Sequence, residues 1–582
     1  MFKLRHSVMA VASVLCAPAA LATTTTPIEH VIVIVGENHT FDNVYGAYQS
    51  PTGKKVANLL SKGIINADGT PGPNFAMAAQ KTARNVFGAN YAIGFGNKKP
   101  YAYLPAPNTT YATDLPFDQE DTRYPANLPN GPFQMTNANA PYDPAPAKTY
   151  YGDPVHRFFQ MWQMTSMGKN DLFTWVGTTT GIGNQSNWGG HSTPTDVQQG
   201  GEAMGFYNMS QGDAPILKAL ADQYALSDNY HQFIMGGTGA NFIGLVTGDV
   251  GFYTQNGQAA VPPALQIENP NPTTDPAIFS VNNNWYSQDG YSGGSYVNCS
   301  DINQPGVKAI FEFIWKKNIF NGGNCAANTY YLVNNYGLAY DQYGNLKPFH
   351  PKATTPETIL PPQTIPTIAD KLAANGISWK YYSGGRNGDA DPNEYCGICD
   401  PLTGFASIMT TEQKYNLQPI ANFDSDISKG SLPAVAYLRP YESKAGHPAN
   451  ATLPDFEQYV LSVVNQVKAN KKLWKNTAIF VTVDEGGGYY DSNYIQPIDF
   501  FGDGSRIPLL VVSSWAKKGH IDHSYGDHAS ILKFIEKNWG LNPLSYRSRD
   551  NLPNPVVGSN GAYIPANQPA ITDLMGLFNF KM

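Results

Sequence analysis

The sequence predicts an α/β fold in which helices cover both faces of a mostly parallel sheet. Two short apolar runs, at residues 28–35 and 478–483, are rich in β-branched side chains, as strands buried on both faces are. Each run stops abruptly at a loop that combines acidic residues with glycine. From residue 360 onward, helical and extended patterns alternate, which is typical of a parallel sheet with covering helices.

The first half of the chain contributes one strand, a few helices and long irregular segments. Residues 38–42 have the pattern of a helix start, and the segments 156–164 and 214–224 predict helices packed on the core. Residues 50–150 are rich in Pro, Asn and Ala and predict a long excursion over the surface. Residues 173–177 have a strand-like pattern that meets three threonines.

The second half supplies most of the predicted sheet. In order, the patterns predict a helix at 365–374, strands at 377–382 and 432–438, a helix at 455–468, strands at 478–483 and 507–513, and a helix from about 527. Asp527 is suited to cap that last helix, and His528 to support its start. Residues 249–360, rich in Asn, Tyr and Pro, are expected to form an insertion that walls a substrate cleft.

Length and charge narrow the classes of function. The chain has 582 residues, 42% of them hydrophobic, which is ample for a large core. Its net charge of −7 and the lack of a basic stripe argue against a nucleic-acid partner. No linker separates domains, so residues 23–582 are expected to form a single catalytic domain with insertions at about 50–150 and 249–360.

Residues 1–22 have the pattern of a signal peptide. A basic start precedes the apolar segment 8–15, and Ala20-Leu21-Ala22 suits cleavage after Ala22. The apolar segment is short for a transmembrane anchor, so a periplasmic or secreted protein is expected. Four cysteines then remain, and an even number in an exported protein favours disulfides. The favoured pairing of three is Cys299–Cys325 with Cys396–Cys399; the alternative for Cys396 and Cys399 is a redox or metal motif.

The two acidic loops predict a metal site. Glu37 and Asn38 follow the first strand, and Asp484 and Glu485 follow the strand at 478–483. Open α/β sheets place their chemistry at the carboxyl ends of strands, so the two loops are expected to meet. Carboxylate and amide oxygens suit a hard divalent cation, whose identity the residues do not specify. The alternative is that Asp484 and Glu485 only cap a turn.

Three consecutive threonines are candidates for a nucleophile. Thr178, Thr179 and Thr180 lie between two glycines, and a hydroxyl on such a turn can attack a substrate when a metal or base activates it. Threonines in a row are also common in ordinary loops, which is the structural alternative.

Four motifs resemble those of the bacterial phosphoesterase family that includes non-specific phospholipases C and related secreted acid phosphatases. They occur in the family's order and read I-E-H-V-I-V-I-V-G-E-N-H-T-F-D-N-V-Y-G, S-D-N-Y-H-Q-F-I-M-G-G-T-G-A-N, V-D-E-G-G-G-Y-Y-D and G-S-R-I-P-L-L-V-V-S-S-W-A-K-K-G-H-I-D-H-S-Y-G-D-H. The resemblance implies an alkaline-phosphatase-like α/β/α sandwich and a metal-assisted phosphoesterase with a Ser or Thr nucleophile. Glu37 and Asn38 match the family's first ligand motif, and Asp484 and Glu485 match its second. The nucleophile falls among Thr178 to Thr180, with Thr179 favoured.

Departures from the family pattern separate two expected activities. Phospholipase members commonly read Asp-Glu-His or Asp-Glu-Asn where this chain has Asp484-Glu485-Gly486. The G-H-P around His447 and the D-F-F-G-D-G run suit the acid-phosphatase branch. The expected function is therefore hydrolysis of small phosphomonoesters, with His447 or His231 protonating the leaving group or binding phosphate. The alternatives are a phospholipase C acting on phosphatidylcholine-type headgroups and a secreted, non-catalytic binding protein.

Overall fold

A computed structural model of the chain describes residues 23–109, 112, 115–116, 119–142, 151–179, 199–272, 286–288, 295–347, 359–389, 391–558 and 563–581. The predicted signal peptide at 1–22 and the candidate nucleophile Thr180 lie outside the described residues.

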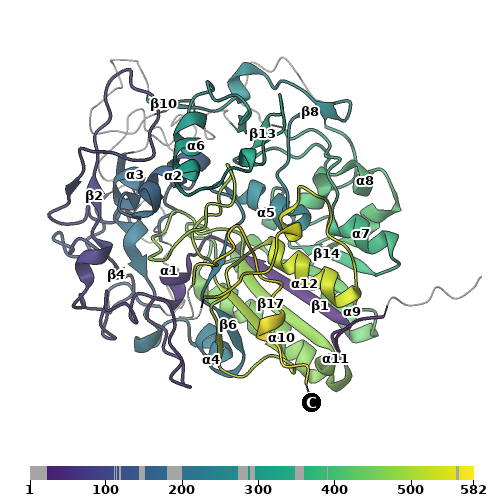
Figure 1. The fold of residues 1–582 in the computed structure, drawn as a ribbon. Helices are drawn as coiled ribbons and strands as arrows, with labels where there is room; N and C mark the ends of the chain where they lie inside the picture. The colour runs from purple at the N-terminus through teal and green to yellow at the C-terminus, as the bar shows by residue number, and fades with distance from the viewer. Residues whose placement is uncertain are drawn as a thin grey trace, which may run out of the picture.

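An eight-stranded sheet forms the centre of the molecule (Figure 1). Its order is β15-β14-β16-β1-β17-β18-β6-β19. The strands are β1 (His30–Gly36), β6 (Ala225–Ser227), β14 (Trp379–Ser383), β15 (Leu417–Pro419), β16 (Val435–Arg439), β17 (Thr477–Val483), β18 (Leu509–Ser513) and β19 (His520–Asp522). β18 is antiparallel to both of its neighbours, and every other pair in this sheet is parallel. The predicted α/β class with a mostly parallel sheet is confirmed.

Strand β18 runs in the direction opposite to its neighbours. The pattern at 507–513 predicted a strand of a mostly parallel sheet, without indicating the direction of this strand. The connection between β17 and β18 contains no helix that could carry the chain back across the sheet. The chain therefore re-enters from the edge where it left, and β18 pairs antiparallel with β17, Thr482 lying opposite Leu509.

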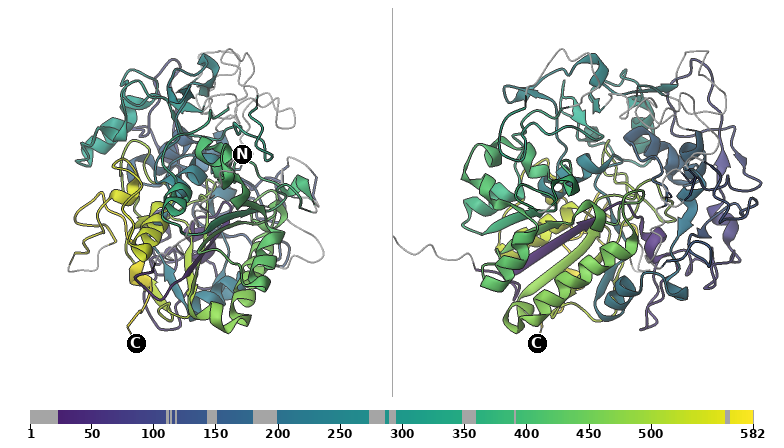
Figure 2. Two further views of the ribbon diagram at one scale, coloured as in Figure 1. Left: turned by 90° about the vertical axis from the view of Figure 1, so that its right-hand side faces the viewer. Right: turned by 180° about the vertical axis from the view of Figure 1, so that it is seen from behind.

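Helices cover both faces of the sheet. The two turned views in Figure 2 show α10 (Leu453–Ala469) on one face and α12 (Ala529–Trp539) on the other. Further helices of the sheet layers are α4 (Pro215–Gln223), α5 (Thr238–Thr247), α7 (Ile368–Ala374), α9 (Ala421–Lys429) and α11 (Lys471–Lys475). The N-cap of α12 is His528 and not Asp527 as predicted, but Asp527 Oδ1 accepts a hydrogen bond of 2.9 Å from Ala529 N and so satisfies a donor in the first turn.

Two long segments depart from the sheet, broadly where the irregular composition predicts insertions. They occupy the left and upper parts of Figure 1. Their regular pieces are short: β2 (Lys81–Thr82), β3 (Lys99–Pro100), β4 (Phe133–Gln134), β5 (Gly205–Phe206), β8 (Thr254–Gln255), β9 (Gln258–Ala259), β10 (Asn269–Pro272), β11 (Tyr286–Gln288), β12 (Tyr296–Val297) and β13 (Tyr331–Leu332). The amphipathic helix α6 (Val307–Lys316) lies within the second segment and was not predicted.

The strand predicted at residues 173–177 is wrong. The segment forms helix α3 (Phe173–Thr179), which packs against α2 (Phe158–Thr165), the predicted aromatic helix. Every residue of α3 is buried, so packing on several sides decides its conformation and overrides the strand preference of its Thr, Val and Trp residues. Other short helices are α1 (Phe41–Tyr45) and α8 (Ala406–Met409). Within the described ranges, none of the helices combines the length and apolar character that a bilayer crossing requires.

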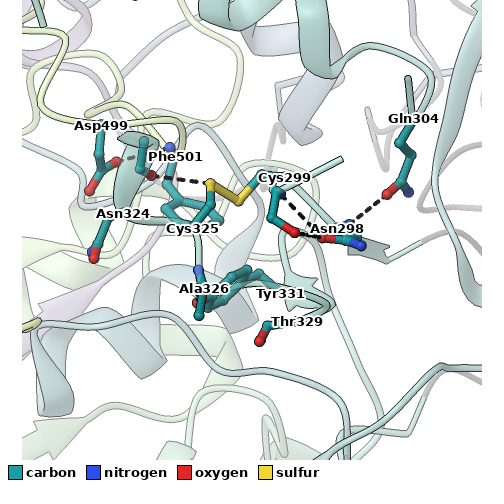
Figure 3. Close-up of a disulfide and its surroundings, with 12 residues drawn as sticks. Asn298, Cys299, Gln304, Asn324, Cys325, Ala326, Thr329, Tyr331, Asp499 and Phe501 are labelled. Carbon is teal, nitrogen blue, oxygen red and sulfur yellow. Dashed lines mark hydrogen bonds between the residues drawn. A yellow bond between two sulfur atoms is a disulfide. The ribbon is translucent and has the colours of Figure 1, made fainter. Parts of the chain in front are cut away.

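Both predicted disulfides are present. Cys299–Cys325 joins two loops of the second insertion beside Asn298 and Tyr331 (Figure 3), with its Cα atoms 5.6 Å apart. It spans 26 residues, a loop whose closure stabilises a fold by about 3 kcal/mol. Cys396–Cys399 closes a tight turn, with a Cα–Cα distance of 5.2 Å.

Candidate active site

The two acidic loops meet at one edge of the sheet. Gly36, the last residue of β1, lies opposite Val483, the last residue of β17, in the parallel register. Glu37 and Asp484 therefore leave the sheet side by side. Backbone hydrogen bonds join the loops, from Asp484 N to Gly36 O (3.1 Å) and from His39 N to Glu485 O (3.0 Å). The expected convergence of the two loops follows directly from the pairing of their strands.

Two glycines after Glu485 allow a close approach of other chain segments. Gly487 has a φ of +60°, and a Cβ atom there would lie 2.6 Å from the Asn38 Cβ. Gly488 has a φ of +74°, and its Cβ would lie 2.6 Å from the Val155 carbonyl oxygen. Any other residue would push away Asn38 or the segment that carries Asp153.

The site contains buried oxygen atoms that lack partners among the described residues. Asp484 and Glu485 are fully buried, and Glu37 is 2% exposed. Asp484 Oδ1 accepts from Glu485 N at 2.8 Å, and Glu485 Oε1 accepts from Thr238 Oγ1 at 2.9 Å. Within the part of the chain that the structure describes, the second oxygens of these carboxylates, Oδ2 and Oε2, have no hydrogen-bond partner, and neither does Asn38 Oδ1. Buried polar atoms are nearly always paired, so three orphaned oxygens in one site require an explanation.

The buried carboxylates oppose one another electrostatically. Burial, and then the negative charge of Glu37, raises the pKa of Asp484 well above its usual value. Burial, and then Asp484, does the same to the pKa of Glu485. Like charges that share a dry site favour protonation unless a cation offsets them.

His447 extends the site, as the sequence predicted. Its Nε2 lies 3.1 Å from Asn38 Nδ2 and 3.5 Å from Glu37 Oε2, and Nδ1 contacts the Pro448 carbonyl oxygen. Burial alone would lower the pKa of His447, but Asp153 and Glu37 raise it to about 9. The ring therefore adds a positive charge to an acidic site.

Asp153 and His156 belong to the same site and were not predicted. Asp153 Oδ1 accepts from Asn38 Nδ2 at 3.3 Å. His156 Nε2 lies 3.5 Å from Glu485 Oε1, and its Nδ1 lies 2.7 Å from the Pro154 carbonyl oxygen. Both residues follow the long irregular excursion, so no strand end marked them in the sequence.

Arg439 is a further member that the sequence could have indicated. It ends β16, the neighbour of β1, and so obeys the same strand-end rule that identified Glu37 and Asp484. Its Nη2 and Nε donate to Glu37 Oε1 at 2.7 and 3.1 Å, and Nη2 also lies 3.1 Å from Glu442 Oε2.

Thr178 and Thr179 lie on the last turn of α3. Thr178 Oγ1 is buried without a partner among the described residues, and the backbone of Gly200 lies against it. Thr179 Oγ1 donates to the Trp175 carbonyl oxygen at 2.6 Å. Within the described residues, neither hydroxyl hydrogen-bonds to the acidic loops, so contacts alone do not join the threonines to the site.

His231 is held by other contacts. Its ring nitrogens lie 2.9 Å from the Gly504 carbonyl oxygen and 3.2 Å from Asn229 Oδ1, and the ring stacks on Tyr525 at 4.3 Å. Burial lowers its pKa to about 3, so it is neutral at ordinary pH. These contacts favour a structural role for His231 over the predicted catalytic one.

The sequence of this chain is similar to those of several known proteins. Residues 28–542 match the model of the Phosphoesterase family. The non-hemolytic phospholipase C of Burkholderia pseudomallei is 27% identical over 264 residues, which cover 37% of this chain and 36% of that protein. Phospholipase C B of Mycobacterium tuberculosis is 20% identical over 549 residues, covering 89% and 74%. The phosphate-repressible acid phosphatase of Penicillium chrysogenum is 28% identical over 195 residues, covering 31% and 44%.

The match thus spans only about a third of the Burkholderia relative's length. Among solved structures, a protein in the alkaline phosphatase superfamily from Vibrio parahaemolyticus aligns over 56% of this chain and 60% of its own, with a TM-score of 0.24 and 12% identity. That similarity is too low to add to the assignment. The family model matches most of the chain, and the acidic loops lie within the matched range. The chain belongs to the phosphoesterase family.

Proposed function

We propose that the protein is a metal-dependent phosphoesterase, and that its main substrates are small phosphomonoesters. The observation that carries the proposal is the set of orphaned oxygens on Asn38, Asp484 and Glu485, which lie with Glu37 at one sheet edge. This donor set consists of hard oxygen atoms, the ligands that divalent cations such as Mg²⁺, Mn²⁺ or Ca²⁺ prefer. The family match supports phosphoester chemistry at the site.

Glu37, Asn38, Asp484 and Glu485 would hold the cation. When bound, it would polarise a phosphoryl oxygen and favour the ionised form of the attacking hydroxyl. Their buried negative charge, which otherwise raises the pKa values of Asp484 and Glu485, gives the site its affinity for a cation.

A threonine hydroxyl among Thr178, Thr179 and Thr180 would attack phosphorus and form a phosphothreonine that water then hydrolyses. Among the described residues, the Thr178 hydroxyl has no hydrogen-bond partner, whereas the Thr179 hydroxyl donates to the Trp175 carbonyl oxygen. Alanine substitution of each threonine in turn tests this step: one variant should be nearly inactive and two should stay active. Three active variants would place the nucleophile elsewhere, for example on a water molecule.

His447 is proposed to protonate the leaving group or to bind phosphate. It is the candidate histidine that contacts both Asn38 and Glu37. A protonated imidazole in that position can donate a proton to a departing alkoxide oxygen.

The second candidate function is a phospholipase C. The observation in its favour is the extent of the match to the Mycobacterium relative, which covers 89% of this chain. A substrate panel separates the candidates: p-nitrophenyl phosphate, bis-p-nitrophenyl phosphate and phosphatidylcholine vesicles, each with and without chelator. Chelator-sensitive turnover of the monoester alone is expected. Turnover of phosphatidylcholine alone would establish the second candidate, and turnover that survives removal of the metal would contradict the metal site.

A non-catalytic binding protein is the remaining alternative, and metal analysis bears on it. The proposed enzyme should hold about one divalent cation per chain after purification without chelator, since one cation can use all four ligands. We also propose that the protein is exported, because its two disulfides are typical of oxidising compartments. Sequencing the N-terminus of the mature protein should give Thr23.

A further inference from the structure

One oxygen of Glu37 is fixed by groups outside the orphaned set. Its Oε1 accepts hydrogen bonds from Arg439 Nη2 at 2.7 Å and from Arg439 Nε at 3.1 Å. Cys399 Sγ lies 2.8 Å from the same oxygen. The other oxygen, Oε2, faces His447 Nε2 at 3.5 Å. The Arg439 guanidinium group and the Cys399 sulfur therefore set the orientation of the Glu37 carboxylate, and with it the position of Oε2 in the site.

The sulfur atom is itself firmly placed. Cys399 is fully buried, and its carbonyl oxygen accepts a hydrogen bond from Tyr381 OH of β14. The next residue, Asp400, forms a buried ion pair with Arg386 and accepts from Tyr395 OH at 3.0 Å. The Cys396–Cys399 turn is thus anchored to the sheet on the side of β1 that β16 and β14 occupy.

The covalent bond between the sulfurs matters to this arrangement. Both sulfurs can approach the Glu37 carboxylate, since the three ligand atoms lie within 4.8 Å of one another. In a disulfide the sulfurs are about 2 Å apart, whereas two thiols need a non-bonded separation of about 3.5 Å. Cys399 Sγ already touches Oε1, so any shift of this sulfur when the bond is lost would change the position of the carboxylate. A new S–H group would also donate to Oε1 and weaken the carboxylate as a ligand.

We propose that the Cys396–Cys399 disulfide is a positioning element for Glu37, so that its loss weakens cation binding at the acidic loops. The inference rests on the proposed metal site. Reduction by a dithiol transfers two electrons and two protons to the S–S bond, gives two thiols, and leaves the reagent as its cyclic disulfide. Cysteine side chains here act through Glu37 and do not touch substrate.

The chain supplies a matched control. Cys299–Cys325 joins loops of the second insertion, and the surroundings drawn in Figure 3 include none of the four proposed ligands. The experiment compares the wild type with C396A/C399A and C299A/C325A, each stripped of metal and titrated with Mn²⁺ while free Mn²⁺ is followed by electron paramagnetic resonance. The same titration of Asp484→Asn is the reference, because Mn²⁺ binding that this variant loses is assigned to the acidic loops.

C396A/C399A is expected to raise the Mn²⁺ dissociation constant at least about tenfold, as loss of an outer-shell partner of a metal ligand does. The control C299A/C325A should stay within about twofold of the wild type. Phosphomonoester turnover by C396A/C399A, expressed per folded chain at each Mn²⁺ concentration, should fall at limiting Mn²⁺ and recover at saturating Mn²⁺. Should that variant fail to fold, mild dithiol reduction of folded C299A/C325A, followed by removal of the reagent, provides the comparison, because of the two disulfides this variant retains Cys396–Cys399.

Equal dissociation constants in the three proteins would overturn the proposal, and so would an equal increase in both double variants. The wild type could bind Mn²⁺ through Asp484 yet hydrolyse no phosphoester. That result would refute the proposed function, and the Mn²⁺ dissociation constants of the three proteins would still test the role of the disulfide. A wild type without Asp484-dependent Mn²⁺ binding would refute both.

Discussion

Two of the buried groups of acidic residues in this fold differ in how their carboxylate oxygens are partnered. The strand-end cluster consists of Glu37, Asp484 and Glu485. The Arg549 cluster consists of Asp499, Asp503 and Asp527 around the Arg549 guanidinium. Their carboxylate oxygens lie 2.9, 2.6 and 3.3 Å, in that order, from Arg549 nitrogen atoms. All of these side chains are almost completely buried.

Every carboxylate oxygen of the Arg549 cluster has a protein partner. Besides Arg549, the donors are Phe501 N to Asp499 at 2.9 Å, Tyr525 OH to Asp503 at 3.0 Å and Ala529 N to Asp527 at 2.9 Å. The strand-end cluster leaves two carboxylate oxygens and the Asn38 amide oxygen unpartnered among the described residues. Partner satisfaction, and not acidity or burial, thus distinguishes these two clusters from each other.

The largest expected effect is on the stability of the Arg549 cluster. Arg549→Met leaves three buried carboxylates without their cation, and should lower the free energy of unfolding by about 3 to 5 kcal/mol. The matched control is Arg547→Met, because Arg547 pairs with Asp249 and its side chain is 20% exposed. Urea unfolding measures both. A loss for Arg549→Met no larger than for the control would contradict the structural role of the cluster.

Asp484→Asn should act on catalysis. It keeps the shape of the side chain but removes a ligand charge, so kcat should fall at least about 100-fold, as loss of a major electrostatic interaction does. The metal-free variant should be no less stable than the metal-free wild type, because a buried charge that lacks compensation is removed. Asp503→Asn is the control from the other cluster, and its folded fraction should keep its kcat. Comparable losses of kcat in both variants would remove the distinction between the clusters.

Cation binding should stabilise the protein through the strand-end cluster alone. At a Mn²⁺ concentration 100 times the dissociation constant, linkage adds about 2.7 kcal/mol to the free energy of unfolding. Thermal unfolding with and without Mn²⁺ should show this shift in the wild type and in Asp503→Asn, but much less of it in Asp484→Asn. An equal shift in all three proteins would indicate that Mn²⁺ binds elsewhere.

Glu202 tests whether one unpartnered oxygen is enough to mark a metal site. Its Oε1 accepts from Gly152 N at 3.1 Å, and its Oε2 has no partner among the described residues. Burial raises its pKa from 4.5 to about 8, so a proton satisfies this single carboxyl group where the strand-end cluster would need a cation.

The sign of the pH effect follows from that pKa. Between pH 4.5 and about 8 the unfolded chain ionises Glu202 while the native protein keeps it protonated, so its contribution to stability falls as pH rises. The slope is at most about 1.4 kcal/mol per pH unit. Glu202→Gln lacks this term, so its stability relative to wild type should increase with pH across that window in urea unfolding. A difference that does not change with pH would contradict the shifted pKa.

The strand-end rule explains why part of the site could be predicted. Glu37, Asn38, Asp484 and Glu485 directly follow β1 and β17, and a buried apolar run is the clearest signal that a sequence gives for a strand. Arg439 follows the same rule. The disulfides could be predicted because four cysteines allow only three pairings.

The rest depends on contacts between segments far apart in the chain. Asp153 and His156 reach the site at the end of a long excursion whose path no local pattern encodes. Helix α3 contradicts its strand-like composition because its surroundings bury it on every side. The direction of β18 depends on whether the loop after β17 returns the chain at the same edge of the sheet or carries it to the opposite edge. The residue pattern alone does not indicate which of these occurs.

The position of β1 also determines when the sheet can form during synthesis of the chain. Val31 pairs with Val435 and Ala478, so β1 is central in the sheet and its partners are synthesised some 400 residues after it. At about 5 to 20 residues per second, that interval is roughly 20 to 80 s. During this time an apolar hexapeptide, V-I-V-I-V-G, has no strand to pair with and needs protection from aggregation. The acidic loops also cannot meet on a growing chain until Glu485 has been added, so the proposed cation site cannot form before β17 has been made.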